Sequence, residues 1–98
     1  WWGDPSFRVM PRTATEKDVR VCHLHINPEF AEQDLNVVLP LQRLQELVDE
    51  GLAGRSADEH YSYMGYILDE TELLEQSVPA IIADLLAQEV DVVVLVPV

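Results

Sequence analysis

Two segments of the chain have the hydrophobic pattern of β-strands. Residues 91–98 form a nearly unbroken aliphatic run, which is typical of a strand buried on both faces of a parallel sheet. Residues 19–26 alternate with a period of two, which places His23 and His25 on one face and Cys22 on the other. We therefore expect strands over 19–26 and 91–98.

A short amphipathic helix is predicted from Leu41 to Glu50, because apolar side chains recur there at helical spacing. Pro40 suits the start of this helix, where its missing N–H is not needed. Gly51 suits the left-handed position just after the helix. The preceding segment is ambiguous, since residues 28–33 are compatible with a helical turn and residues 36–40 with an extended chain.

A second helix is expected to begin near Asp69 or Thr71. Asp69 as the N-cap, with Glu72 three residues later, approximates a capping box. Pro79 lies inside the apolar pattern that follows. It should kink this helix or split it in two, because proline lacks an N–H and clashes with the preceding turn.

The order strand, helix, helix, strand favours a parallel pair joined by a right-handed crossover. We predict an α/β fold with a partial three-layer open sheet that is mostly parallel and has a βαβ-like crossover. Residues 1–18 are expected to be extended or irregular, and residues 52–68 to form a connection. Because two strands rarely make a stable sheet, further strands are expected outside residues 1–98. Residues 1–98 are thus expected to be a single α/β domain of a larger protein.

Composition and charge narrow the class of protein. The chain has 98 residues, of which 48% are hydrophobic and 24% charged, as in globular domains. Its net charge of −12, from 18 acidic and 6 basic residues, disfavours nucleic acid and anionic membranes as partners. No apolar run approaches the roughly 20 residues that cross a bilayer. A single cysteine fits a reducing compartment, so we expect a cytoplasmic protein.

The two neighbouring histidines allow two interpretations. His23 and His25 are spaced so that they can chelate a metal, with His60 or Asp34 completing the site. The alternative is a pair of polar residues near a strand end that are hydrogen-bonded or solvated. That alternative is favoured, because no HExxH or CxxC motif frames the histidines.

Three further groups are candidates for chemistry. Residues 60–65, His-Tyr-Ser-Tyr-Met-Gly, can orient a small substrate or donate protons, although a turn with aromatic anchors is favoured by residue type. Asp34 and Asn36 can bind an amine or cap a helix, and composition does not choose between these roles. Cys22 is expected to be a buried, inert thiol, because no thiol or basic group adjacent in sequence lowers its pKa.

Four segments in one order resemble the selenoprotein B subunits of glycine/sarcosine/betaine/D-proline reductases. Each segment is weak alone, but together they cover essentially the whole chain. The segments are residues 3–11 (GDPSFRVMP), 33–44 (QDLNVVLPLQRL), 60–65 (HYSYMG) and 90–98 (VDVVVLVPV).

The resemblance implies a redox centre that this chain does not carry. In the family, the strand that matches residues 91–98 leads into a motif of Cys or selenocysteine, two residues and Cys, which opens a helix. A helix N-terminus lowers the pKa of such a thiol or selenol. The implied reaction is reductive cleavage of the C–N bond of a small amine or amino-acid-derived substrate. The nucleophile is expected beyond Val98, with no cofactor in this chain. A stop at a selenocysteine codon, cleavage or a longer chain would each account for this end.

Residue type and placement suggest which side chains line the pocket above the strand ends. His60 is expected to be the catalytic proton donor or substrate-orienting group. The expected substrate-binding residues are His23, His25, Asp34, Asn36, Tyr61 and Ser62. The expected partners are other reductase subunits or a second copy.

Two other classes of function stay open at this point. One is a non-catalytic interaction or scaffold subunit, in which residues 91–98 complete the sheet of a partner. The other is a metal-binding module built on His23, His25 and His60.

Overall fold

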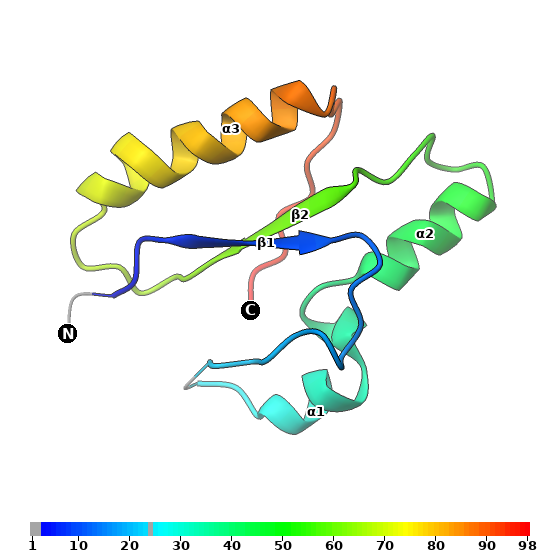
Figure 1. Cartoon of the computed structure of the whole chain (residues 1–98). Coiled ribbons are helices and arrows are strands. Elements are labelled where there is room, and N and C mark those ends of the chain that lie inside the picture. Colours follow the sequence, from blue (N-terminus) through cyan, green and yellow to red (C-terminus); the bar gives the residue numbers. More distant parts are fainter. Residues whose placement is uncertain (1–2, 24) are drawn as a thin grey trace. The chain divides into compact units, whose positions relative to one another are not determined.

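The computed structural model describes residues 3–23 and 25–98, which form two compact units. Figure 1 shows their helices and strands. Unit 1 contains the described residues up to Pro11 together with Ala57–Val93, and unit 2 contains Arg12–Ser56 together with Val94–Val98.

Unit 1 is built on an antiparallel pair of strands, β1 (Phe7–Pro11) and β2 (Glu59–Tyr63). Phe7 lies opposite Tyr63, and Val9 lies opposite Tyr61. Aromatic and β-branched side chains favour strands because they pack well against neighbours across the ladder. The ring centroids of Phe7 and Tyr61 are 6.0 Å apart, so the two strands share an aromatic face.

A helix that begins with π-helical turns and continues with α-helical turns follows β2 in unit 1. Helix α3 (Val78–Ala87) continues directly from the π-helical segment η2 (Leu73–Ser77). The N–H of Val78 donates to the carbonyl of Leu73, five residues back. Pro79 explains this turn, because it has no N–H to offer the carbonyl four residues back and its ring needs room there. The disturbance expected at Pro79 is therefore present as a π turn.

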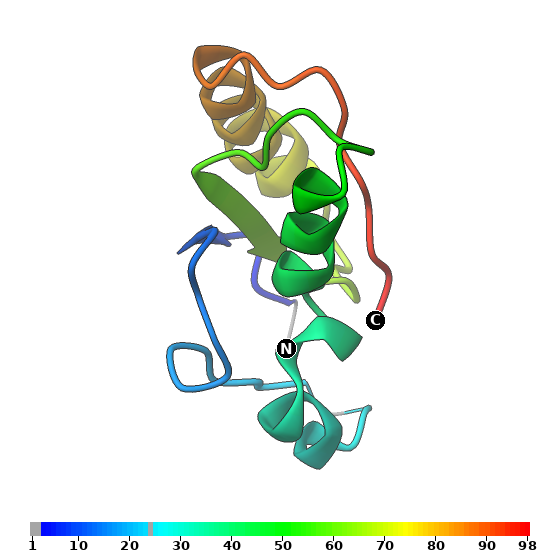
Figure 2. The same ribbon diagram turned by 90° about the vertical axis from the view of Figure 1, so that its right-hand side faces the viewer.

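Hydrogen bonds fasten helix α3 at both of its ends to the antiparallel pair of β1 and β2 or to the residues just before it. We call this pair of strands the ribbon. At its start, the Ser77 hydroxyl donates to the carbonyl of Pro5 over 2.7 Å. At its end, Gln88 Oε1 accepts the Glu59 N–H at 3.0 Å, and Gln88 Nε2 donates to the Tyr61 hydroxyl at 2.9 Å. The helix therefore runs along the ribbon antiparallel to β2, as two directions of view show (Figure 1, Figure 2).

Unit 2 contains α1 (Pro28–Gln33), the 3-10 turn η1 (Leu35–Val37) and α2 (Leu41–Asp49). The helix predicted over residues 41–50 is thus confirmed, and Gly51 has the expected left-handed backbone with a φ of 78°. The small core of unit 2 consists of Ala31, Leu35 and Leu41, which are the buried hydrophobic side chains among the described residues.

The start of the second helix also agrees with the sequence. The helical turns begin at Thr71, and Asp69 Oδ1 accepts the N–H of Thr71 at 3.1 Å. Within residues 3–23 and 25–98, no helix combines the length and the apolarity that a membrane crossing needs.

The predicted fold class is wrong. The described residues form a two-stranded antiparallel sheet with helices, and not a mostly parallel three-layer sheet with a βαβ-like crossover. Neither residues 19–26 nor residues 91–98 form a strand, although Leu24 lies outside the described residues. An aliphatic run indicates a need for burial, but a strand also needs a pairing partner. Here Val92 is 77% exposed and Leu95 74% exposed.

The fastening by Gln88 leads to a test in the complete subunit. Gln88→Ala should lower the free energy of unfolding by about 1 kcal/mol, because two hydrogen bonds are lost and the Glu59 N–H loses its acceptor. Amide hydrogen exchange at Glu59 should become faster. Gln45→Ala is the matched control, since Gln45 donates only to the exposed Asp49 side chain. Equal effects of the two substitutions would contradict the assigned role of Gln88.

Candidate functional site

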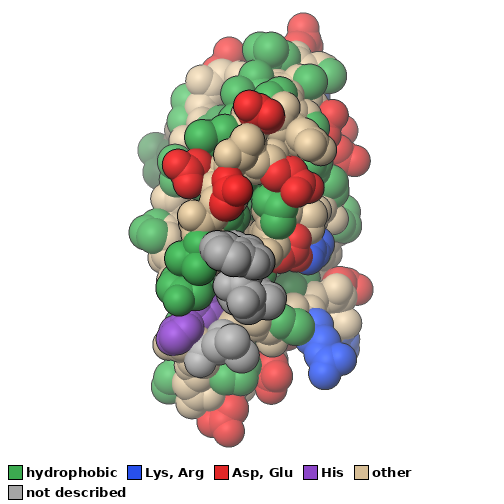
Figure 3. Space-filling view, turned by 90° about the vertical axis from the view of Figure 1, so that its left-hand side faces the viewer, with side chains coloured by type: hydrophobic (Ala, Val, Ile, Leu, Met, Phe, Trp, Pro, Cys, Tyr) green, Lys and Arg blue, Asp and Glu red, His purple; other side chains and the backbone are tan. Residues whose placement is uncertain are grey.

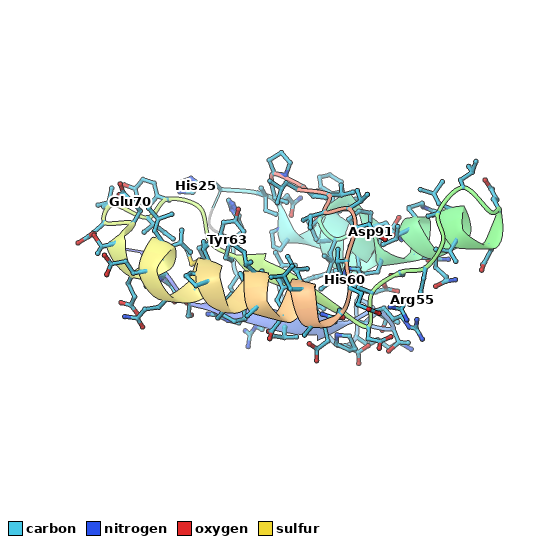
Figure 4. The ribbon with its side chains drawn as sticks, turned by 90° about the horizontal axis from the view of Figure 1, so that it is seen from above. His25, Arg55, His60, Tyr63, Glu70 and Asp91 are labelled. Atoms are coloured by element: carbon cyan, nitrogen blue, oxygen red, sulfur yellow. The ribbon has the colours of Figure 1, made fainter. Side chains whose placement is uncertain are left out.

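The predicted cluster around His60 lies on strand β2 and not in a loop. Successive side chains of a strand point to opposite faces, so His60 and Ser62 share one face while Tyr61 and Tyr63 share the other. Figure 4 labels His60 and Tyr63 on this strand. The cluster is therefore divided between the two faces of the ribbon.

Tyr61 is held by its surroundings in unit 1. Its hydroxyl accepts the hydrogen bond from Gln88, and its ring lies against Phe7. Burial raises the pKa of Tyr61 above 10.0, and the negative charge of Asp84 adds to this rise. Tyr61 therefore stays protonated at neutral pH and anchors α3. This arrangement agrees with the aromatic-anchor alternative.

His60 is half-buried, and it lies opposite Met10 in the ladder. Burial lowers the pKa of His60 below its usual 6.5, while a hydrogen bond with the backbone of Ala57 opposes the shift. The imidazole is therefore neutral at pH 7. A neutral imidazole can donate through one nitrogen and accept through the other.

His23 and His25 lie together in unit 2, on an irregular segment. The His25 N–H donates to His23 Nδ1 at 3.0 Å, and the ring centroids are 6.1 Å apart in a perpendicular arrangement. Both residues are exposed. No group of three His, Cys, Asp or Glu side chains that could hold a metal ion occurs in the described part of the chain. The structure therefore supports the hydrogen-bonded alternative for this pair.

Cys22 is exposed, so the expectation of a buried thiol is wrong. That expectation depended on a strand over residues 19–26 with one face in the core. Because the segment is not a strand, it has no face that would bury the thiol.

Asp34 and Asn36 form a hydrogen-bonded turn that joins two helices of unit 2. Asp34 Oδ1 accepts the Asn36 N–H at 3.0 Å and Asn36 Nδ2 at 2.8 Å. Asn36 Oδ1 in turn accepts the N–H of Arg43, in the first turn of α2, at 3.1 Å. Pro40 makes no side-chain cap for α2, so Asn36 caps this helix from a distance.

The same bonds set the charge of the turn. Hydrogen bonds from the side chain and the backbone of Asn36 lower the pKa of Asp34 below 3.8. Asp34 is therefore a carboxylate at neutral pH. In the structure, Asp34 and Asn36 therefore act as helix caps, which is one of the two expected alternatives. The carboxylate of Asp34 also gives the turn a negative charge.

An apolar pocket of about 280 Å³ lies in unit 2, beside α1 and η1. Its walls are Ile26, Asn27, Phe30, Ala31, Val37, Val38 and Val98. Val98 thus lines the same pocket as residues that follow His25 and residues that follow Asn36. This pocket was not predictable from the sequence, because the aliphatic pattern of residues 91–98 predicted a strand instead.

Unit 1 has a shallow polar groove of about 300 Å³ beside the π turn. It is lined by Ser6, Phe7, Glu72, Gln76 and Ser77. In the sequence, Pro79 indicated the π turn, because its missing N–H produces that turn. The position of the π turn next to β1 depends on tertiary packing and was not indicated.

Comparison with known proteins identifies the family. The family model for glycine/sarcosine/betaine reductase selenoprotein B (GRDB) matches residues 2–98. The chain belongs to this family. The resemblance found in the sequence is therefore confirmed.

The curated proteins include a relative of this chain. D-proline reductase subunit gamma of Acetoanaerobium sticklandii is 31% identical over 93 residues, which cover 95% of this chain. The chain spans 38% of the length of that relative. No solved structure matches the chain.

The expected site residues of the chain fall into two groups. The structure brings His23 together with His25, and Asp34 together with Asn36. All four lie in unit 2, whereas His60, Tyr61 and Ser62 lie in unit 1.

The lowered pKa of His60 can be measured in the complete subunit by NMR titration. We expect a midpoint below 6.5, with the resonance assigned from its loss in His60→Gln. Because the folded state disfavours the charged imidazole, the stability that His60 contributes is present above pH 6.5. It declines as the pH falls from 6.5 towards the folded-state pKa. His60→Gln should remove this part of the pH dependence. A midpoint at or above 6.5 would contradict the assignment.

Proposed function

We propose that the chain is a segment of a selenol- or thiol-dependent reductase subunit. The reaction proposed is reductive cleavage of the C–N bond of a small amino-acid-derived substrate of the glycine, sarcosine, betaine or D-proline type. Residues 1–98 would belong to a single domain of that subunit. The observation that carries the proposal is the family match over residues 2–98, together with a relative named as a D-proline reductase subunit.

The redox nucleophile is proposed to follow Val98. Support comes from the apolar pocket, because Val98 is one of its walls together with Asn27 and Val38. A chain that continues from Val98 would start in unit 2, which also contains the Asp34–Asn36 turn. A thiol or selenol placed there would supply the electron pair that displaces the amine.

Asp34 is the proposed contact for the amine of the substrate. Its carboxylate is ionised at neutral pH, and both bonds from Asn36 end on Oδ1. An ammonium group is proposed to bind at Oδ2, where the opposite charge makes a charge-assisted hydrogen bond. The other proposed substrate-binding residues are His23, His25, Asn36, Tyr61 and Ser62.

His60 is proposed to be the proton donor of the reaction or a group that orients the substrate. When the C–N bond breaks, the amine departs with the electron pair and must take up a proton. With a pKa below 6.5, His60 is mostly neutral at pH 7, and the donor is its minor protonated form, which is the stronger acid for having the lowered pKa. Its position on β2 is fixed by the ladder with β1.

Alkylation locates the nucleophile in the complete, reduced subunit. We expect iodoacetamide to inactivate the enzyme and to modify a Cys or selenocysteine in the peptide that follows Val98. Cys22 is exposed and is the competing thiol in this chain, so the experiment is repeated in Cys22→Ser. Inactivation should persist there at an unchanged rate. Inactivation that follows modification of Cys22 would contradict the proposal.

Substitution of His60 tests its role. His60→Ala in the complete subunit should lower turnover at least 100-fold, the usual size of an acid–base contribution. Its half-exposed position predicts a loss of only about 1 kcal/mol in the free energy of unfolding. Dithiol-dependent reduction of glycine, sarcosine, betaine and D-proline gives the activity, and urea unfolding gives the stability. A loss of turnover no larger than the loss of folded protein would make His60 structural.

A second candidate function is a non-catalytic scaffold subunit. The exposed aliphatic residues from Val92 onward favour it, since an extended apolar segment invites association with another chain. The same dithiol-dependent assay distinguishes the two, because a scaffold subunit shows no turnover of its own with any of these substrates.

A further inference from the structure

The outward surface of α3 is entirely apolar. The exposed residues of this helix are Pro79, Ala80, Ile82, Ala83, Leu86 and Ala87. Ile82 is 50% exposed and Leu86 is 72% exposed. The one charged residue of α3, Asp84, is partly buried instead. A helix that is hydrophobic on all sides is typical of an element that is covered on more than one side.

The ribbon covers only one side of α3. Ile81, Leu85 and Gln88 are partly buried, and the fastening to β2 lies at Gln88. The buried hydrophobic side chains that the structure describes are all in unit 2, so the described residues of unit 1 include none. Unit 1 therefore leaves most of its apolar surface to be covered by another element.

The rim of this apolar surface is acidic at both ends. Glu75 precedes α3 and Glu89 follows it, which places the two about 20 Å apart at the rise of a helix. No lysine or arginine follows Arg55 in the sequence. Figure 4 labels Glu70 before the helix and Asp91 after it, and Figure 3 shows acidic side chains among hydrophobic ones at the end where the helix begins.

We propose that this outward face of α3 is the docking surface for another protein subunit. The partner would present an apolar groove for Ile82 and Leu86, with Lys or Arg side chains about 20 Å apart at the two ends of the groove. The inference depends on the proposed function only in that the partner is sought among the other subunits of the reductase.

Charge complementarity selects a basic protein over the other occupants. A second copy brings the same acidic rim and a net charge of −12, so it would be repelled. An anionic membrane or a nucleic acid would be repelled in the same way. In the proposed complex, the apolar side chains supply affinity, while the acidic rim speeds association and sets the orientation.

The first test removes the apolar contacts in the complete subunit. Ile82→Gln with Leu86→Gln keeps good helix formers, so the circular dichroism spectrum should not change. Binding to the purified partner subunits, followed by analytical ultracentrifugation, should weaken at least tenfold. Leu52→Gln is the matched control, since Leu52 is 73% exposed in unit 2, and it should bind as the unaltered subunit does. Unchanged binding by the double variant would overturn the proposal.

The second test concerns the rim. Glu75→Lys with Glu89→Lys should slow association about tenfold at low salt, with the difference disappearing at high salt. Glu16→Lys with Glu50→Lys changes the net charge equally but in unit 2. Equal slowing by the two pairs would show an effect of overall charge and would contradict the assignment to α3.

The third test separates a partner subunit from the subunit's own remaining chain. Ala83→Cys, in a Cys22→Ser background, is alkylated and the modification is measured on the peptide that carries it. We expect fast labelling in the isolated subunit and slow labelling in the complex. Slow labelling in the isolated subunit would show that its own chain covers α3, and fast labelling in both would show that nothing does. Either result overturns the proposal. These readouts do not use turnover, so an inactive subunit that still binds would count against the proposed function alone.

Discussion

The side-chain amide of Gln88 joins the helix of unit 1 to its pair of strands. It accepts from the backbone of β2 at Glu59 and donates to the hydroxyl of Tyr61, so one side chain joins the end of α3 to both the ladder and the aromatic face. Two strands alone are marginal in water, and the helix supplies the third element. This fastening commits the Tyr61 face of the ribbon to α3, and strand alternation then places His60 on the other face. The position of the proposed proton carrier therefore depends on a contact made by a different residue.

The sequence predicted local features well. The helix over residues 41–50, the cap at Asp69 and the disturbance at Pro79 each depend on neighbouring residues and could be predicted. Strands β1 and β2 pair across about fifty residues, as the register of Val9 with Tyr61 shows, and no local pattern reports such a pairing. The aliphatic run of residues 91–98 did report a need for burial, but the residues that would cover it are not its neighbours here.

The candidate site could be predicted in part for the same reason. Residue type and placement indicated Asp34 and Asn36, whereas the bond from Asn36 to the backbone of Arg43 depends on how two helices of unit 2 meet. The chemistry proposed for Asp34 uses the charge that this turn maintains. The apolar residues on α3 and those from Val92 onward are exposed for the same physical reason. In each case the unit itself does not cover them, and their contact with water is unfavourable. A partner at the docking surface proposed on α3 would cover some of these residues.

In the proposed reaction, the nucleophile of the subunit approaches its substrate from the apolar pocket at Val98, with the substrate's amine on Asp34. A crystal structure of the complete, reduced subunit with a bound unreactive substrate analogue would show both contacts. We expect the chain to leave the pocket beside Asn27 and to place a thiol or selenol against the analogue, with the analogue's ammonium on the Asp34 carboxylate. An analogue bound far from both Asp34 and the residues after Val98 would contradict it.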